Sequence, residues 1–201
     1  MIKFIKNNIP NSLKRRLKLG LRNILETPIY YAFKRECVPK KDIKRVVFVC
    51  KGNVCRSPFA EQLMRSLVTE RGISVESCGL RVNQGAVPPC EAIDAALTFN
   101  VDIRDHIPKH ISVIDLNSID LLIPMEYCQY REVLVLVPDT KQNVHLLREF
   151  TPVPDSLLCN IADPYGQPID EYIKCYSLIR SAVYSLYSKM FNDSSVIERL
   201  R

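Results

Sequence analysis

Apolar and polar positions alternate along most of the chain in the pattern of a parallel sheet covered by helices. Short runs of β-branched and apolar residues, typical of buried strands, are separated by longer segments with apolar residues at helical spacing. The expected strands are 45–50, 73–79, 119–125 and 143–150, and the expected helices are 57–72, 88–100, 126–137 and 168–191. This order predicts an α/β fold: a single three-layer domain with a four-stranded parallel sheet flanked by helices, in which ligands bind at the carboxyl ends of the strands.

The amino-terminal part of the chain has a different pattern, that of a basic amphipathic helix. Its apolar residues recur at helical spacing, with lysines and arginines on the other faces. They are Leu13, Leu17, Leu21, Ile24 and Leu25. The pair Asn11-Ser12 can cap this helix, and Pro28 should end it. Such a helix binds anionic lipid or a partner, or packs against its own domain.

From this change of pattern we expect three units. Residues 1–43 form a basic amphipathic extension and linker, residues 44–192 form the main α/β domain, and residues 193–201 form a carboxyl-terminal tail. Within the first unit, "CVPKKDIKR" is typical of a polar linker. We also expect residues 1–30 to make weak contact with a membrane or a partner.

Composition places the chain among ordinary globular proteins. Of its 201 residues, 47% are hydrophobic and 25% are charged, and neither a membrane-spanning run nor a secretory signal is present, so we expect a cytoplasmic protein. The net charge of +6 arises in residues 1–45, which carry 13 basic and three acidic residues. The remainder is acidic, and we expect no nucleic-acid partner. The eight cysteines are scattered, which favours free thiols over a disulfide framework.

The chemistry lies in "CKGNVCRS", residues 50–57, between an expected strand and an expected helix. Gly52 and Asn53 can adopt backbone conformations that turn successive N–H groups toward one anion, and the helix amino terminus adds positive potential. Arg56 can grip two phosphate oxygens with its planar guanidinium. The same environment stabilises a thiolate, which makes Cys50 a candidate nucleophile, with Ser57 as a hydrogen-bond donor to it. A nucleotide-binding P-loop is excluded because the G-K-[ST] ending is absent.

These residues resemble the low-molecular-weight protein tyrosine phosphatases. "VCKGNVCRSPFAE" matches the family signature C-x-G-N-x-C-R-S-P-x-A-E, and "DPYG", residues 163–166, resembles its second motif. The resemblance implies that Cys50 attacks phosphorus, that Arg56 and the loop amides stabilise the transition state, and that Asp163 protonates the departing phenolate. A cysteinyl-phosphate intermediate follows, and neither a metal nor another cofactor is needed.

The resemblance also implies a substrate-binding set. Its members are Lys51, Gly52, Asn53, Val54, Cys55, Ser57 and Tyr165. Tyr165 would be a wall for an aromatic ring, and Cys55 would protect oxidised Cys50 by forming a disulfide with it. One departure is the segment "LRVNQGAV", residues 80–87, which lacks the aromatic residue of many relatives. We interpret His106 and His110 as surface or helix-end residues and not as metal ligands.

Two short segments, "SCGL" (residues 77–80) and "ME" (Met125-Glu126), are most similar to one bacterial group of the family. Its members accompany exopolysaccharide synthesis and oppose a membrane-associated tyrosine kinase. The expected partner is therefore a phosphotyrosine protein, with such a kinase as the candidate, and the expected location is the cytoplasm at the inner face of the membrane.

Three other functions fit parts of the sequence. An arsenate reductase shares the loop, but Cys78, Cys90 and Cys128 are not at its expected downstream positions. A protein-arginine phosphatase favours threonine where this chain has Val54. A weakly active phosphoprotein-binding module is disfavoured because Cys50, Arg56 and Asp163 are all present.

Overall fold

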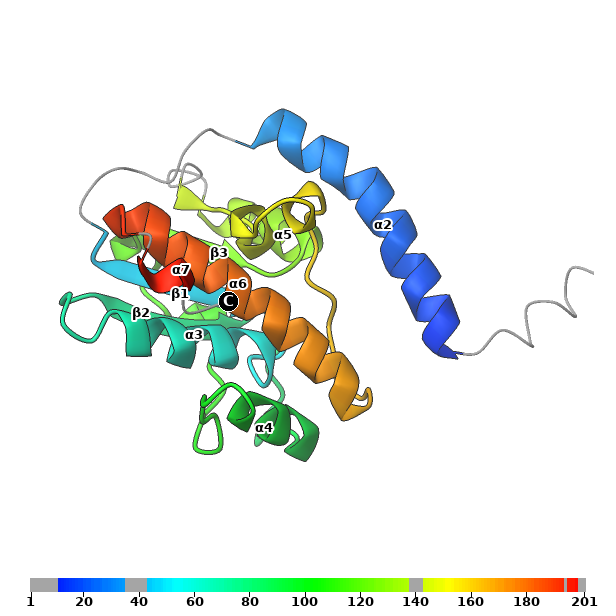
Figure 1. The fold of residues 1–201 in the computed structure, drawn as a ribbon, viewed down its shortest axis with the longest axis horizontal. Helices are drawn as coiled ribbons and strands as arrows, with labels where there is room; N and C mark the ends of the chain where they lie inside the picture. Colours follow the sequence, from blue (N-terminus) through cyan, green and yellow to red (C-terminus); the bar gives the residue numbers. More distant parts are fainter. Residues whose placement is uncertain (1–10, 35–42, 138–142, 194, 199–201) are drawn as a thin grey trace, which may run out of the picture.

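The computed structural model of the chain describes residues 11–34, 43–137, 143–193 and 195–198. At its centre is a parallel sheet in the order β2-β1-β3 (Figure 1). Strand β1 spans Arg45–Cys50, β2 spans Ser74–Gly79 and β3 spans Leu121–Pro124. The expected strands at these three places are confirmed. Because β1 is central, five of its six residues are buried, and its carboxyl end opens between those of its neighbours.

Helices cover both faces of this sheet. Val46, Phe48 and Cys50 of β1 belong to a core shared with α3 (Arg56–Leu67), α4 (Cys90–Leu97) and α6 (Ile169–Phe191). Val47 and Val49 belong to a second core, shared with α5 (Tyr127–Leu136) and with Tyr30 from the amino-terminal helix α2. In Figure 1, α6 crosses in front of the sheet and α5 lies behind it. The α/β class with a parallel sheet between helices is therefore as expected.

The expected fourth strand is wrong for the described part of the chain, which contains three strands. Val144 makes a single parallel bridge to Leu122, and the His145 N–H donates to the Leu122 carbonyl at 3.1 Å. The next amide, that of Leu146, donates instead to the Tyr30 hydroxyl at 3.0 Å. That amide points away from β3, and the ladder ends because the chain leaves the extended conformation after Leu146. Residues Leu147–Phe150 form a short 3-10 helix, η4.

Other boundaries differ in detail from the sequence expectations. Helix α3 ends at Leu67, before the expected stop at Gly72, which has a φ of 66° in the turn that precedes β2. Three more 3-10 helices connect the main elements: η1 (Ile111–Val113), η2 (Leu116–Ser118) and η5 (Asp155–Leu157). Near the carboxyl end, α7 (Ser195–Glu198) places Val196 in the first core.

Helix α2 spans Asn11–Phe33 and continues through Pro28, where we expected it to end. Proline inside a helix costs about 3 kcal/mol, so other contacts must hold the last turn. Tyr30 is 1% exposed, and its hydroxyl contacts Glu149, while the Tyr31 hydroxyl donates to the Ser156 carbonyl. These tertiary contacts outweigh the local effect of Pro28. The expected linker lies mostly outside the described residues.

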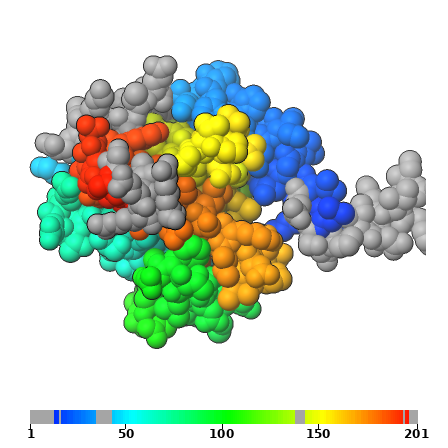
Figure 2. All heavy atoms as spheres, viewed as in Figure 1, coloured from blue at the N-terminus to red at the C-terminus, as the bar shows by residue number. Residues whose placement is uncertain are grey.

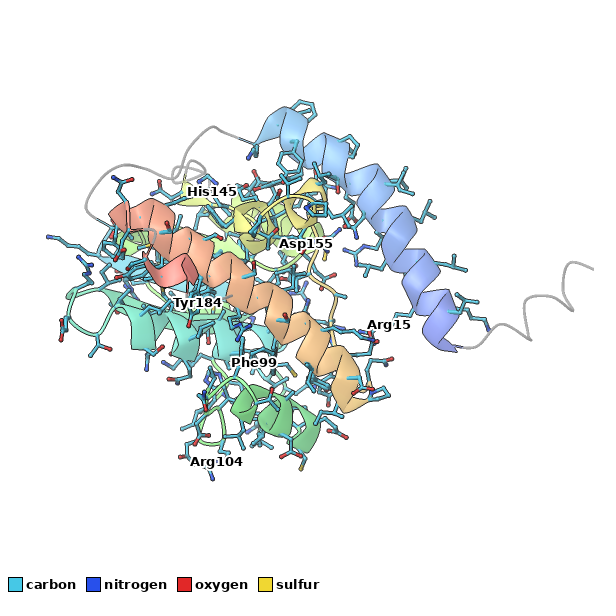
Figure 3. All side chains as sticks on the ribbon, in the orientation of Figure 1. Arg15, Phe99, Arg104, His145, Asp155 and Tyr184 are labelled. Carbon is cyan, nitrogen blue, oxygen red and sulfur yellow. The ribbon has the colours of Figure 1, made fainter. Side chains whose placement is uncertain are left out.

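The polar side of α2 packs along the segment that joins η4 to α6. Asn23 and Thr27 accept hydrogen bonds from the backbone amides of Asn160 and Cys159, both at 3.2 Å. Figure 2 shows α2, in blue, lying against this yellow segment, and Asp155, labelled in Figure 3, belongs to it. Of the two alternatives for this helix, packing against its own domain therefore occurs. No helix of the described residues has the length and apolar character to cross a membrane.

Candidate active site

Cys50 ends β1 at the entrance of the loop that leads into α3. Its sulfur accepts hydrogen bonds from the Asn53 backbone amide at 3.2 Å and from the Ser57 hydroxyl at 3.0 Å. Helix α3 begins at Arg56, so the positive end of its dipole lies at the same loop. Two donors and a helix terminus favour negative charge on the sulfur, as a nucleophilic thiol requires.

Asn53 organises this loop from beneath. It has a φ of 54° and is fully buried. Its side-chain amide donates to the hydroxyls of Ser57 at 2.9 Å and Ser77 at 2.7 Å, and its carbonyl accepts from the Lys109 amide at 2.7 Å. We expected an unusual backbone conformation at both Gly52 and Asn53, but only Asn53 is left-handed. Asparagine tolerates that conformation better than most residues, and here its side chain fixes it.

Gly79, at the end of β2, is a site residue that the sequence did not reveal. A Cβ atom there would lie 2.8 Å from Val82 Cγ2 and 3.0 Å from the Asn53 nitrogen. No larger residue fits without displacing the loop. The signal in the sequence was the glycine at the end of an expected strand, where a close backbone approach is common.

Arg56 lies at the bottom of the loop, 1% exposed. Its Nη1 donates to Glu126 Oε1 at 2.7 Å and to the Ile161 carbonyl at 3.0 Å, while Nη2 lies 3.1 Å from Asp163 Oδ2. Burial alone would lower the pKa of Arg56, but the carboxylates of Asp163 and Glu126 outweigh it and raise the pKa above its usual value. The guanidinium is therefore charged, and it lines the cavity described next.

A cavity of about 520 Å³ opens above this loop. It is lined by Cys50, Arg56 and Asp163, so the structure brings the three expected catalytic residues to one place. The expected binding residues that also line it are Lys51, Gly52, Val54, Cys55 and Tyr165. Asn53 and Ser57 do not line it, because both are buried under the loop. Its remaining lining residues are Arg81, Asn83, Gln84, Gly85, Ala86, Val87 and Pro89.

Tyr165 provides the one aromatic ring among these lining residues, and it is 62% exposed at the rim. The wall from the segment 83–87 has no ring, as its sequence indicated. Arg81 was not expected at the site; it is paired with Glu132 at 2.6 Å. The organic group of a phosphate ester bound at Arg56 would thus lie between two walls. One is the aromatic ring of Tyr165, and the other is the mixed polar and aliphatic segment 83–87.

The family model for "Low molecular weight phosphotyrosine protein phosphatase" matches residues 45–196. The chain belongs to this family. Probable low molecular weight protein-tyrosine-phosphatase EpsP of Ralstonia solanacearum is 28% identical over 141 residues, which cover 70% of this chain and 92% of that protein. Low molecular weight protein-tyrosine-phosphatase Wzb of Escherichia coli K12 is 29% identical over 138 residues, covering 68% and 89%. Both relatives agree with the subgroup expected from the sequence.

The fold agrees with solved structures of the family. The low molecular weight protein tyrosine phosphatase of T. tengcongensis superposes with a TM-score of 0.64 and 28% identity, covering 73% of this chain and 99% of that one. The chain is therefore a protein-tyrosine phosphatase and a hydrolase, as we expected. Helix α2 lies outside the residues that match the family model.

Glu126 is a second residue of this phosphatase site that sequence reasoning did not assign. Besides Arg56, it accepts a hydrogen bond from Arg22 of α2, with 2.8 Å between Nη1 and Oε2. Burial alone would raise the pKa of Glu126, but Arg56 and Arg22 outweigh it and the pKa is lowered. Glu126 is therefore an ionised link between Arg56 and a helix outside the family match.

His106 is not a surface residue, which corrects our interpretation. Its side chain is 6% exposed and its Nε2 lies 3.1 Å from Asn53 Oδ1, so it supports the phosphate loop through Asn53. Burial lowers the pKa of His106 to about 4, and the ring is neutral at pH 7. His110 caps η1 by accepting from the Ser112 amide at 3.2 Å, which is the expected helix-end role.

Cys55 is buried beside Cys50 in the loop, and every described cysteine is a free thiol. Burial raises the pKa of Cys55, and so does the neighbouring Cys50. Cys55 is thus a neutral thiol next to Cys50. Within the described residues no group of three or more His, Cys, Asp or Glu side chains is arranged to hold a metal ion.

Proposed function

We propose that this phosphatase hydrolyses phosphotyrosine through a cysteinyl-phosphate intermediate formed on Cys50. The observation that carries the proposal is that Cys50, Arg56 and Asp163 line one cavity, with Arg56 paired to Asp163 at 3.1 Å. The Cys50 thiolate attacks phosphorus, the bond from phosphorus to the phenolic oxygen breaks, and Asp163 gives its proton to that oxygen. Water then attacks phosphorus, the bond to sulfur breaks, and Asp163 takes the proton.

Arg56 and the loop stabilise the charge that develops during both steps. The Nε–Nη2 edge of Arg56 binds two equatorial oxygens, and the amides of residues 51–55 bind the others. Ser57 donates to the sulfur at 3.0 Å, which stabilises the thiolate again when it leaves. Tyr165 packs against the substrate ring, and Val54 and Lys51 border it.

The test uses two aryl phosphates, one with a good leaving group (4-nitrophenyl) and one with a poor one (phenyl), without added metal. The wild type should hydrolyse both and be inhibited by vanadate, and Cys50→Ser should show no measurable turnover. Asp163→Ala should lower kcat for the poor leaving group by roughly 100-fold or more and have a much smaller effect for the good one. Asp102→Ala, which removes an exposed carboxylate outside the cavity, is the control. Equal losses for both substrates in Asp163→Ala would contradict its role as the acid.

We also propose that Cys55 protects the nucleophile. Peroxide oxidises the Cys50 thiolate to a sulfenic acid, the Cys55 thiol attacks that sulfur, and water leaves as the disulfide forms. A thiol reductant then restores both residues. After peroxide and reductant, Cys55→Ser should recover a smaller fraction of its own initial activity than wild type or the control Cys90→Ser. Full recovery in Cys55→Ser would rule out protection.

For the substrate, we propose a tyrosine-phosphorylated, membrane-associated kinase of exopolysaccharide synthesis, reached through α2. The anchoring residues Asn23, Thr27 and Tyr30 share one face of this helix. The opposite face carries large apolar side chains that are 46–70% exposed: Leu13, Leu17, Leu21, Ile24 and Leu25. Lys14 and Lys18 are exposed at the same end. An apolar stripe with lysines suits an anionic lipid surface.

Two measurements separate the lipid from the substrate. Leu17→Gln/Leu21→Gln should weaken co-sedimentation with vesicles containing anionic lipid, whereas Val135→Gln, at an even more exposed apolar position on α5, should not. Unchanged co-sedimentation would remove the membrane proposal. Trapping with Asp163→Ala in the cells that express the protein should capture a phosphotyrosine kinase; capture of phosphoarginine proteins instead would contradict the substrate class.

A further inference from the structure

Arg22 of α2 contacts the carboxylate that holds the catalytic arginine. We propose that Arg22 is a positioning residue: through Glu126 it fixes the orientation of Arg56 and keeps its charge available for phosphate. The inference rests on the proposed function, which assigns phosphate binding to Arg56.

The geometry leaves Glu126 little freedom. Its Oε2 accepts from Arg22 at 2.8 Å, and its Oε1 accepts from Arg56 at 2.7 Å and from Gln129 at 3.2 Å. Because both oxygens are engaged from opposite sides, the carboxylate cannot rotate without losing a charge-assisted hydrogen bond. Arg22 is itself held by Glu26, with 3.2 Å between Nε and Oε1. Arg22, Glu126 and Arg56 thus form a chain from α2 to the phosphate loop.

Neighbouring contacts place Arg22 independently of this chain. Asn23 Oδ1 accepts from the backbone and the side chain of Asn160, at 3.2 and 3.1 Å, and the Asn160 carbonyl oxygen Oδ1 accepts from the Tyr127 amide at 2.7 Å. Both asparagines are buried. Helix α2 therefore stays docked when the Arg22 side chain alone is changed, and a kinetic effect of such a change reports on Glu126 and Arg56.

Charge gives Arg22 its second effect. Arg56 faces two carboxylates, Glu126 at 2.7 Å and Asp163 at 3.1 Å, which together exceed its single positive charge. Arg22 supplies a second cation to the cluster. Without it, Glu126 would act on Arg56 alone, and the cavity would attract a phosphate dianion less strongly. Removing Arg22 should therefore weaken phosphate binding as well as turnover.

A cleft of about 460 Å³ lies beside this cluster, and both α2 and Asp163, the proposed general acid, line it. It is lined on one side by Arg15, Lys18 and Arg22, and on the other by residues that include Asp163 and Pro164. In Figure 3, Arg15 lies on the side of α2 that faces the start of α6. Arg22 and Glu126 both line this cleft, so added salt can reach and weaken their ion pair.

The experiment compares Arg22→Gln with Lys34→Gln in the full-length chain. Lys34 is a matched control: its side chain is also 29% exposed, and it pairs with Glu149 at the other end of α2, at 3.5 Å. Arg22→Gln should raise the inhibition constant for inorganic phosphate and lower kcat/KM for an aryl phosphate, each by roughly five- to tenfold, the size of a partly buried ion pair. Lys34→Gln should leave both unchanged, and Arg22→Lys should recover most of the loss.

A double-mutant cycle then tests whether Arg22 acts through Glu126. In a Glu126→Gln background, Arg22→Gln should have no further effect on phosphate inhibition. Additive effects, or an Arg22→Gln variant that matches wild type or Lys34→Gln, would overturn the proposal. If Glu126→Gln does not fold, recovery by Arg22→Lys still decides, since failure of Lys to recover would exclude a charge-based role. Calorimetric binding of inorganic phosphate needs no turnover, so it tests Arg22 even if the wild type lacks phosphatase activity.

Discussion

The phosphate loop and helix α2 meet at Glu126, but they are held by different kinds of contact. In the loop, the Cys50 sulfur accepts hydrogen bonds from residues three and seven positions away. Asn53 donates a hydrogen bond to Ser57, four positions away. In α2, Arg22 donates a hydrogen bond to Glu126, 104 positions away, and Asn23 accepts one from Asn160, 137 positions away. The loop is specified mainly by its own short sequence, whereas the role of α2 is specified by distant partners.

The difference explains why one region can be recognised from a motif and the other cannot. The loop matches the family signature, while α2 lies outside the family match. Yet both act on Arg56, the loop by placing it and α2 by bracing Glu126. A region absent from a family pattern can therefore still belong to the catalytic architecture, and substitutions in each region can measure its share.

The largest effect is expected in the loop, from Asn53→Ala. The change leaves the buried hydroxyls of Ser57 and Ser77 and the Lys109 amide without the Asn53 side chain, which should cost about 3–5 kcal/mol of unfolding free energy. Misplacing the nucleophile should lower kcat roughly 100-fold. Urea denaturation and aryl phosphate kinetics measure the two effects. Asn53→Gly, which tolerates the positive φ, should regain some stability but not kcat; full recovery by glycine would show that the side-chain amide is dispensable.

A smaller effect is expected where α2 is anchored, from Tyr30→Phe. Without the hydroxyl, buried Glu149 and the Leu146 amide lose a partner, which should lower the unfolding free energy by about 2–3 kcal/mol. Because Tyr30 is remote from the cavity lining, kcat should change little. Phe33→Leu, at a position 80% exposed on the same helix, is the control. Unchanged stability in Tyr30→Phe would mean that α2 is not an integral part of the fold, which would break the comparison.

The smallest effect is expected in the phosphate loop, from the pH dependence that His106 gives to the unfolding free energy. His106 has a folded-state pKa of about 4, below the ordinary 6.5, so the unfolded chain binds a proton between these values that the folded chain does not. Unfolding free energy should therefore fall by about 1–2 kcal/mol as the pH drops from 6.5 to 5. His106→Gln should show a shallower fall over that interval. Parallel curves for the two proteins would contradict a neutral, buried His106.

Most of the domain beyond residue 45 could be predicted from the sequence, because its strands and helices have the periodicity of their class. The three expected catalytic residues meet in one cavity, as the resemblance to the family implied. The fourth strand was wrong because the apolar run 143–150 does not reveal that its second half, Leu147–Phe150, forms a 3-10 helix. His106 was misread because its partner, Asn53, lies 53 positions earlier in the chain.

For a related reason, the sequence left open whether helix α2 docks on its own domain. Hydrophobic periodicity drew attention to its leucines, but the face that docks uses Asn23, Thr27 and Tyr30, and a polar interface leaves no apolar pattern to read. Glu126 entered the sequence analysis only as part of the "ME" resemblance, and nothing there indicated a contact with Arg56. Only three-dimensional proximity distinguishes it.

The order of synthesis gives these distant contacts a consequence for the nascent chain. Helix α2 leaves the ribosome before the domain on which it docks, because the asparagine that receives Asn23 is made 137 residues later. Until then the polar side of α2 has no docking partner and its leucines are exposed. Chaperones therefore have a long interval in which to bind this helix. Helix α2 therefore cannot dock fully until Asn160 has been translated, and a product truncated before Asn160 would carry an undocked α2.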